Sequence, residues 1–108
     1  MIIVLGRVTT RADGFAQALE LSQEHVARSR AEPGCIAHAV HHDTENPLGL
    51  VFVEQWASQE ALFAHFKVPA SKVFAKALAS LATEPPHMDM FSAEAVGLPP
   101  RSTSAVQA

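Results

Sequence analysis

The chain has 108 residues, which is the usual size of a single domain. Its 48% hydrophobic and 18% charged residues are ordinary for a globular protein. The net charge of −3 and the scattered Lys and Arg residues argue against nucleic-acid binding and against a membrane-surface helix. Cys35 is the only cysteine, so an internal disulfide is impossible and a reducing, cytoplasmic location is expected.

The first part of the chain predicts a strand followed by a helix. Ile2–Thr9 is β-branched and apolar on both faces, and its apolar run is too short for a signal sequence or a membrane span. Asp13 is a plausible N-cap for a helix over Phe15–Ala31, whose residues are strong helix formers. Pro33 and Gly34 end that helix.

The middle of the chain predicts a β-hairpin. Cys35–Asp43 reads as one strand and Leu48–Trp56 as the next, with turn-forming residues 44–47 between them. Alternation in the second of these strands divides its residues between two faces, with Leu50, Phe52, Glu54 and Trp56 on one and Val51, Val53 and Gln55 on the other.

The last part predicts a helix that bends or restarts at Pro69, and then a fourth strand. Ser58 is a good N-cap for a helix over Gln59–Phe66. Pro69 interrupts the pattern, and helical spacing resumes over Ser71–Leu81. His87–Val96 alternates as a strand does.

The resulting order is strand, helix, strand, strand, helix, strand. It is that of an α+β, ferredoxin-like βαββαβ domain over residues 1–96, with an antiparallel sheet and both helices on one face. Residues 97–108 are rich in Gly, Pro and polar residues, and we expect a flexible C-terminal tail there. The second sheet face carries apolar residues such as Val51 and Val53, so we expect a homodimer with two sheets packed face to face.

Several short motifs resemble one known family. Glu32-Pro33-Gly34-Cys35 precedes a strand, and Glu54-Gln55-Trp56 is followed by a helix with Ala61-Leu62 and His65. Together, and in this order of elements, they look like the antibiotic biosynthesis monooxygenase family over roughly residues 2–96. The resemblance implies a ferredoxin-like dimer, the dimeric α+β barrel. For characterised members it also implies oxygenation of polycyclic phenols or quinols without a cofactor.

The resemblance also indicates a site. Trp56 and His65 match positions that line the family's pocket, and Glu54 matches the motif's acidic residue. Without a metal or flavin, a base must ionise the substrate, and an imidazole titrates near neutral pH, so His65 suits that role. Trp56 could stack on a flat ring or donate its N–H, and Glu54 could orient the imidazole. The other residues that we expect to contact substrate are Phe52, Phe66 and Met88.

Each of these residues also has a structural interpretation. Trp56 at a strand end could be part of the core, as could Met88. His65 could be bonded to Glu54 or to a carbonyl that fixes the strand–helix corner, and Glu54 could be a structural acceptor.

We expect no metal and no other cofactor. His38 and His42 share a strand face but are too far apart for easy joint coordination, and neither a cysteine nor a second histidine pair completes a site with them. The haem-degrading branch of the fold uses an asparagine in the first strand, and Ile2–Thr9 contains none.

The sequence therefore favours a cofactor-independent monooxygenase that uses dioxygen on a small aromatic quinol or phenol. Its catalytic residues would be His65 and Trp56, and Arg7 could supply a positive charge. Two alternatives stay open: a non-catalytic small-molecule binder or stress-related dimeric protein, and an isomerase or lyase that uses the same base to move a proton.

Overall fold

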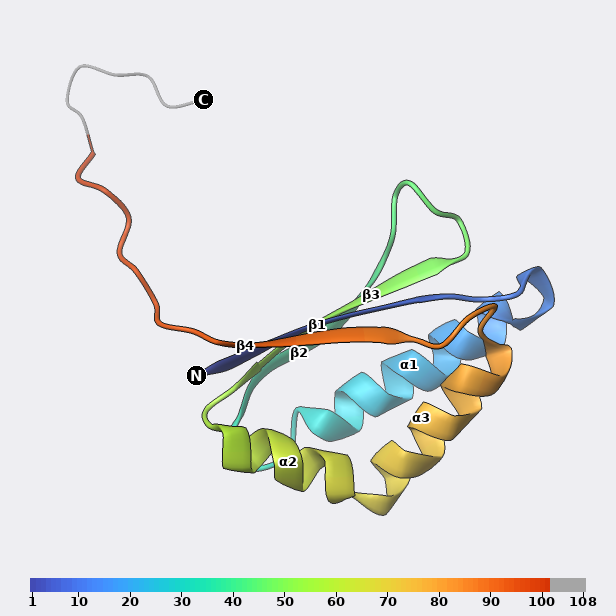
Figure 1. Ribbon diagram of the computed structural model, residues 1–108, viewed down its shortest axis with the longest axis horizontal. Coiled ribbons are helices and arrows are strands. Elements are labelled where there is room, and N and C mark those ends of the chain that lie inside the picture. The colour runs from blue at the N-terminus through green and yellow to red at the C-terminus, as the bar shows by residue number, and fades with distance from the viewer. Residues whose placement is uncertain (102–108) are drawn as a thin grey trace.

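The computed structural model describes residues 1–101 and contains one antiparallel sheet covered by helices on one side. Figure 1 shows all three α-helices on the same side of the sheet. The elements are β1 (Ile2–Thr9), a 3-10 turn (Ala12–Gly14), α1 (Phe15–Ser29), β2 (Cys35–His42), β3 (Gly49–Trp56), α2 (Gln59–Lys67), α3 (Pro69–Leu81) and β4 (His87–Ser92).

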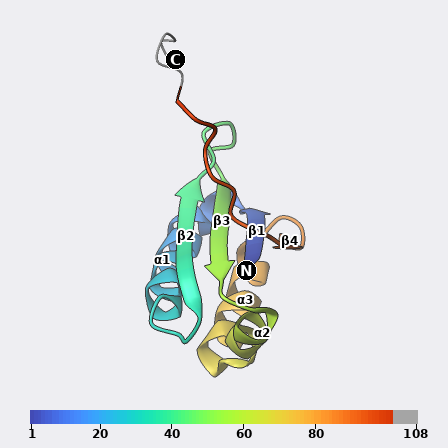
Figure 2. The ribbon, with the colours of Figure 1, turned by 90° about the vertical axis from the view of Figure 1, so that its left-hand side faces the viewer.

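The strand order is β2-β3-β1-β4, as Figure 2 shows. β1 lies in the middle and pairs antiparallel with both β3 and β4, so Val4 faces Glu54 on one side and Met90 on the other. This connectivity confirms the α+β, ferredoxin-like fold expected from the order of elements.

The core lies between the sheet and the helices in two clusters. One is built around Leu50, Phe52 and Leu78, and the other around Trp56 and Leu62, which are fully or almost fully buried. Strand alternation brings Phe52, Glu54 and Trp56 to this side. The polar Glu54 therefore lies among core residues, which is the first sign of a site.

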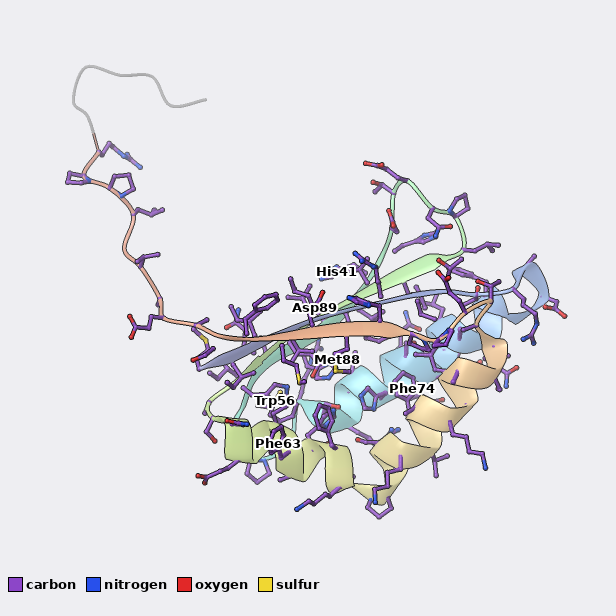
Figure 3. The ribbon with its side chains drawn as sticks, in the orientation of Figure 1. His41, Trp56, Phe63, Phe74, Met88 and Asp89 are labelled. Atoms are coloured by element: carbon purple, nitrogen blue, oxygen red, sulfur yellow. The ribbon has the colours of Figure 1, made fainter. Side chains whose placement is uncertain are left out.

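The opposite face of the sheet is uncovered. Leu5 is 43% exposed there, and Val51 and Val53 are half-buried. Figure 3 shows His41 and Asp89 on this side, while Met88, Trp56 and Phe74 lie between the sheet and the helices. The apolar second face expected from the alternation is therefore present.

Three details differ from the sequence-based expectations. Asp13 does not cap α1, because it lies in the 3-10 turn and its carboxylate binds Arg11 at 3.3 Å. The helix restarts at Pro69 rather than at Ser71, because Pro69 occupies the first turn of α3, where its missing N–H costs nothing. β4 ends at Ser92 rather than Val96, because β1 begins at Ile2, which pairs with Ser92.

Residues 93–101 continue from β4 away from the sheet without a helix or strand (Figure 1). The rest of the tail expected over residues 97–108 lies outside the described residues. Within residues 1–101, no helix combines the length and the hydropathy that a membrane span requires.

Candidate active site

A cavity of about 350 Å³ lies between the sheet and the helices. It is mostly apolar, with a few ionisable groups. Its walls come from every strand except β2 and from all three α-helices, and they are formed by Gly6, Arg7, His25, Phe52, Glu54, His65, Phe66, Ser71, Lys72, Phe74, Ala75, Leu78, Pro86, His87 and Met88. A concave, largely apolar site with few polar groups is typical of small-molecule binding.

Glu54 lies in the wall of this cavity, and its carboxylate contacts two neighbouring side chains. Trp56 Nε1–H donates a hydrogen bond of 2.9 Å to Glu54 Oε1, and both side chains are buried. His38 Nε2 lies 3.2 Å from the same oxygen. Trp56 and Glu54 are two residues apart on β3, so they share one sheet face and reach each other directly.

His65 on α2 is held by a different carboxylate. Its Nδ1 lies 2.8 Å from Glu32 Oε1, which belongs to the turn between α1 and β2. A carboxylate only accepts, so Nδ1 carries the proton and the lone pair of the neutral ring is on Nε2. The sequence-based suggestion that Glu54 orients His65 is therefore corrected: Glu32 does so, because the turn brings it closer.

Three histidines meet at this wall: His25 and His65 line the cavity, and His38 lies behind them. The ring centres of His25, His38 and His65 are 5.2 to 5.6 Å apart, and each ring offers a nitrogen within 4.8 Å of the others'. His25 is also stacked on Phe74, with ring centres 4.1 Å apart. All three histidines are buried.

Burial shapes the charge state of the cluster. It is the main cause that lowers the pKa of His25 to about 3, and the neighbouring His38, His65 and Arg28 lower it further. Burial alone would raise the pKa of Glu54, but the contact with His38, the N–H of Trp56 and the nearby His65 together bring it below its usual value. At neutral pH His25 is therefore neutral and Glu54 is a carboxylate.

The structure brings together most of the residues expected from sequence. His65, Glu54, Phe52, Phe66 and Met88 all line the cavity, and Arg7 is also on its wall. Trp56 does not line it: the indole is fully buried, its N–H is bound to Glu54, and its ring packs on His65 with centres 4.6 Å apart. In this structure the Trp56 side chain contacts Glu54 and His65 and not the cavity.

Three members of the site were missed from sequence. His25 is three residues beyond the buried Ser22 on α1, and that spacing could have placed it on the inner face. Strand alternation relates His38 only to His42 on its own strand, and it does not indicate the histidines of other elements that His38 meets. The partnership of Glu32 with His65 spans 33 positions, and no local pattern indicates it.

Comparison with known proteins identifies the family. The sequence model of the antibiotic biosynthesis monooxygenase family matches residues 1–77. The chain belongs to this family. The expectation drawn from the Glu-x-Trp and Ala-Leu-x-x-His motifs is thereby confirmed.

The family likeness extends to individual proteins. An uncharacterized protein of Synechocystis sp. is 29% identical over 90 residues, which cover 83% of this chain and 61% of that protein. A candidate antibiotic biosynthesis monooxygenase from Deinococcus radiodurans superposes with a TM-score of 0.85 at 24% identity, over 93% of this chain and all of the other. SnoaB from Streptomyces nogalater, a cofactor-independent oxygenase, gives a TM-score of 0.76 at 19% identity, over 88% and 94% of the two chains. At these identities the solved structures show a shared fold.

Proposed function

We propose that this member of the antibiotic biosynthesis monooxygenase family is a cofactor-independent monooxygenase that acts on a small aromatic quinol or phenol. The observation that carries the proposal is the His65–Glu32 pair at the wall of an apolar cavity. It presents an imidazole lone pair on Nε2, and a base of this kind is what ionisation of a phenol requires.

The rest of the cavity suits a flat aromatic ring. Phe52, Phe66 and Phe74 supply aromatic walls, and Met88 from β4 supplies a flexible apolar one. The fold shared with SnoaB, itself a cofactor-independent oxygenase, supports the reaction class.

The chemistry balances without an external reductant. His65 takes the phenolic proton, and the anion passes an electron to dioxygen. The resulting radical pair joins at a ring carbon that bears hydrogen and forms a peroxide. Loss of water from the peroxide leaves a carbonyl, so a phenol and one O₂ give a quinone and one H₂O. Glu32 stabilises the imidazolium that forms on the way.

The functional form that we propose is a cytoplasmic homodimer. The uncovered sheet face carries exposed Leu5 and the half-buried Val51 and Val53, and a second copy of the same face would cover them.

Dioxygen uptake with a menadiol-like quinol tests the activity. The assay contains a chelator, and uptake without protein is subtracted. We expect His65→Ala to reduce uptake by about 100-fold, in the range of a lost general base. Glu32→Gln should reduce it less, because the amide oxygen still accepts from Nδ1 but no longer carries a charge.

The matched control is His42→Ala, since His42 is an exposed histidine outside the cavity whose ring contacts the Pro47 carbonyl. It should retain wild-type uptake. If His65→Ala also retains full uptake, His65 is not the base. If the wild type consumes no dioxygen but binds the quinol, the protein is a binder, and rearrangement of an enol substrate without uptake would indicate an isomerase.

A further inference from the structure

We propose that His25, His38 and His65 form a binding site for a divalent transition metal ion of the Zn²⁺ type. The site goes beyond the oxygenase proposal, which requires no metal. It is buried beside the cavity, and the three ligands come from α1, β2 and α2.

The spacing of the rings fits such an ion. Zn–N distances are about 2 Å and the ring centre lies about 1 Å further out, so three imidazoles at tetrahedral positions have centres about 5 Å apart. The observed separations are 5.2, 5.3 and 5.6 Å. The nitrogens lie within 4.8 Å of one another, and ring rotations that bring them to about 3.3 Å would complete the tetrahedral geometry.

A buried nitrogen without a partner points to a ligand. His38 is fully buried; its Nε2 faces Glu54 Oε1 at 3.2 Å, and its Nδ1 makes no hydrogen bond to any residue that the structure describes. An unsatisfied buried polar atom is costly, and a metal ion bound to Nδ1 would satisfy it. This imidazole with an unsatisfied nitrogen, in contact distance of two others, is the observation that separates a ligand site from a packed histidine cluster.

The acidic residues next to the three histidines are placed as they are at known metal sites, where they orient the ligands and attract the ion. Glu32 holds the proton of His65 on Nδ1, which leaves Nε2 free, and carboxylate-bonded imidazoles of this kind are the usual second partners at zinc sites. Glu54 adds a buried carboxylate beside His38 and attracts a cation.

One neighbouring residue, Arg28, disfavours binding of the metal ion. Arg28 Nη2 lies 3.4 Å from His25 Nδ1, and a guanidinium only donates, so this nitrogen is an acceptor and Nε2 carries the proton. Metal binding must shift that proton or displace Arg28. Arg28 also places a positive charge near the site, so it limits affinity.

The metal and the base would compete. Because a bound ion takes up the lone pair of His65, the metal-loaded protein could not accept a phenolic proton there. Occupation of the site is therefore expected to suppress metal-free oxygenation. His25 and His65 also line the cavity, so the fourth coordination position would be open to a small ligand.

The test is titration of the full, untagged chain with Co²⁺, followed by competition with Zn²⁺. We expect the visible absorption of tetrahedral Co²⁺, which Zn²⁺ abolishes at one equivalent per chain. His25→Gln and His38→Gln should each weaken binding by at least about 100-fold, and Glu32→Gln by about 10-fold. Arg28→Gln should tighten it. Absence of a tetrahedral spectrum in the wild type would overturn the proposal.

The control is the double variant His41→Gln/His42→Gln, which removes two exposed histidines far from the cluster and should leave the affinity unchanged. Loss of binding in this variant, with retention in His38→Gln, would show an adventitious surface site and overturn the proposal.

A measurement on the wild type avoids variants that fail to fold: Zn²⁺ should shift the ring NMR signals of three of the six histidines. Shifts confined to exposed histidines would contradict the site. Dioxygen uptake in chelator is measured separately, so either proposal can fail alone.

Discussion

At the inner end of the cavity, a single carboxylate oxygen serves two side chains. Glu54 Oε1 accepts from Trp56 Nε1 and lies beside His38 Nε2. A buried carboxylate needs such partners, because removal of one leaves part of its charge unsatisfied. The tryptophan that made the motif recognisable in the sequence therefore contacts this carboxylate through its N–H.

This contact predicts an energetic coupling between Trp56 and Glu54. In a double-mutant cycle with Trp56→Phe and Glu54→Met, we expect a coupling free energy of about 1–3 kcal/mol, measured by urea unfolding. Phe retains most of the ring but lacks the N–H donor. The same cycle between Trp56 and Phe74, which form no hydrogen bond with each other, is the control and should be close to additive. A coupling with Glu54 below about 0.5 kcal/mol would contradict this role.

At the scale of elements, the α1–β2 turn and α2 determine where His65, the proposed base, lies. Gly34 in this turn has φ +80°, and a Cβ there would lie 2.5 Å from Ala61 Cβ on α2. The Gly34 carbonyl also accepts a 2.7 Å hydrogen bond from the Ala57 N–H. The turn that carries Glu32 is thereby packed tightly against the start of the helix that carries His65.

Gly34→Ala should therefore destabilise the fold by about 2 kcal/mol or more, since the left-handed backbone and the close approach both disfavour a side chain. It should also weaken the His65–Glu32 contact and reduce dioxygen uptake. Gly97→Ala is the matched control, because nothing lies within 4 Å of a Cβ there, and it should change the free energy of unfolding by less than about 0.5 kcal/mol. Equal losses of unfolding free energy in Gly34→Ala and Gly97→Ala would show that close packing at Gly34 does not stabilise the fold.

Ser58 begins α2 as the sequence predicted. Its Oγ accepts a 3.1 Å hydrogen bond from the Ala61 N–H. Ser58→Ala should lower the free energy of unfolding by about 1 kcal/mol, whereas Ser58→Asp retains a capping oxygen and should preserve stability. Thermal or urea unfolding of the two variants measures this difference, and a loss of equal size in both would show that the cap is not its source.

For the molecule as a whole, the uncovered sheet face determines the expected assembly. Leu5 and Phe91 are 43% and 50% exposed on β1 and β4, which pair with each other. We expect sedimentation at micromolar concentration to give twice 11.6 kDa, and Leu5→Lys to shift the protein toward the monomer because a buried ammonium would lose its hydration. Val73→Lys on the helix side, where Val73 is 69% exposed, should leave the mass unchanged. A wild-type mass near 11.6 kDa would contradict the dimer.

The fold was predictable because its signals are local. Alternation placed Phe52, Glu54 and Trp56 on one face, and the Ser58 cap marked the start of α2. The histidine cluster was not predictable, because His25, His38 and His65 meet only through tertiary packing. A β-bulge between Cys35 and Ala37 also changes the register of β2. The position of Trp56 behind the cavity wall was equally hidden, since a strand-end tryptophan can either pack or face a ligand.

The origin of the three rings in α1, β2 and α2 has a consequence for folding. No hairpin or helix pair of this chain contains all three, so the cluster forms only when the α1–β2 turn has docked against α2. A ligand that needs the complete cluster would bind the native state and not its partly folded precursors. Such a ligand would slow unfolding much more than it would speed folding, so the lifetime of the native protein would depend on the concentration of that ligand.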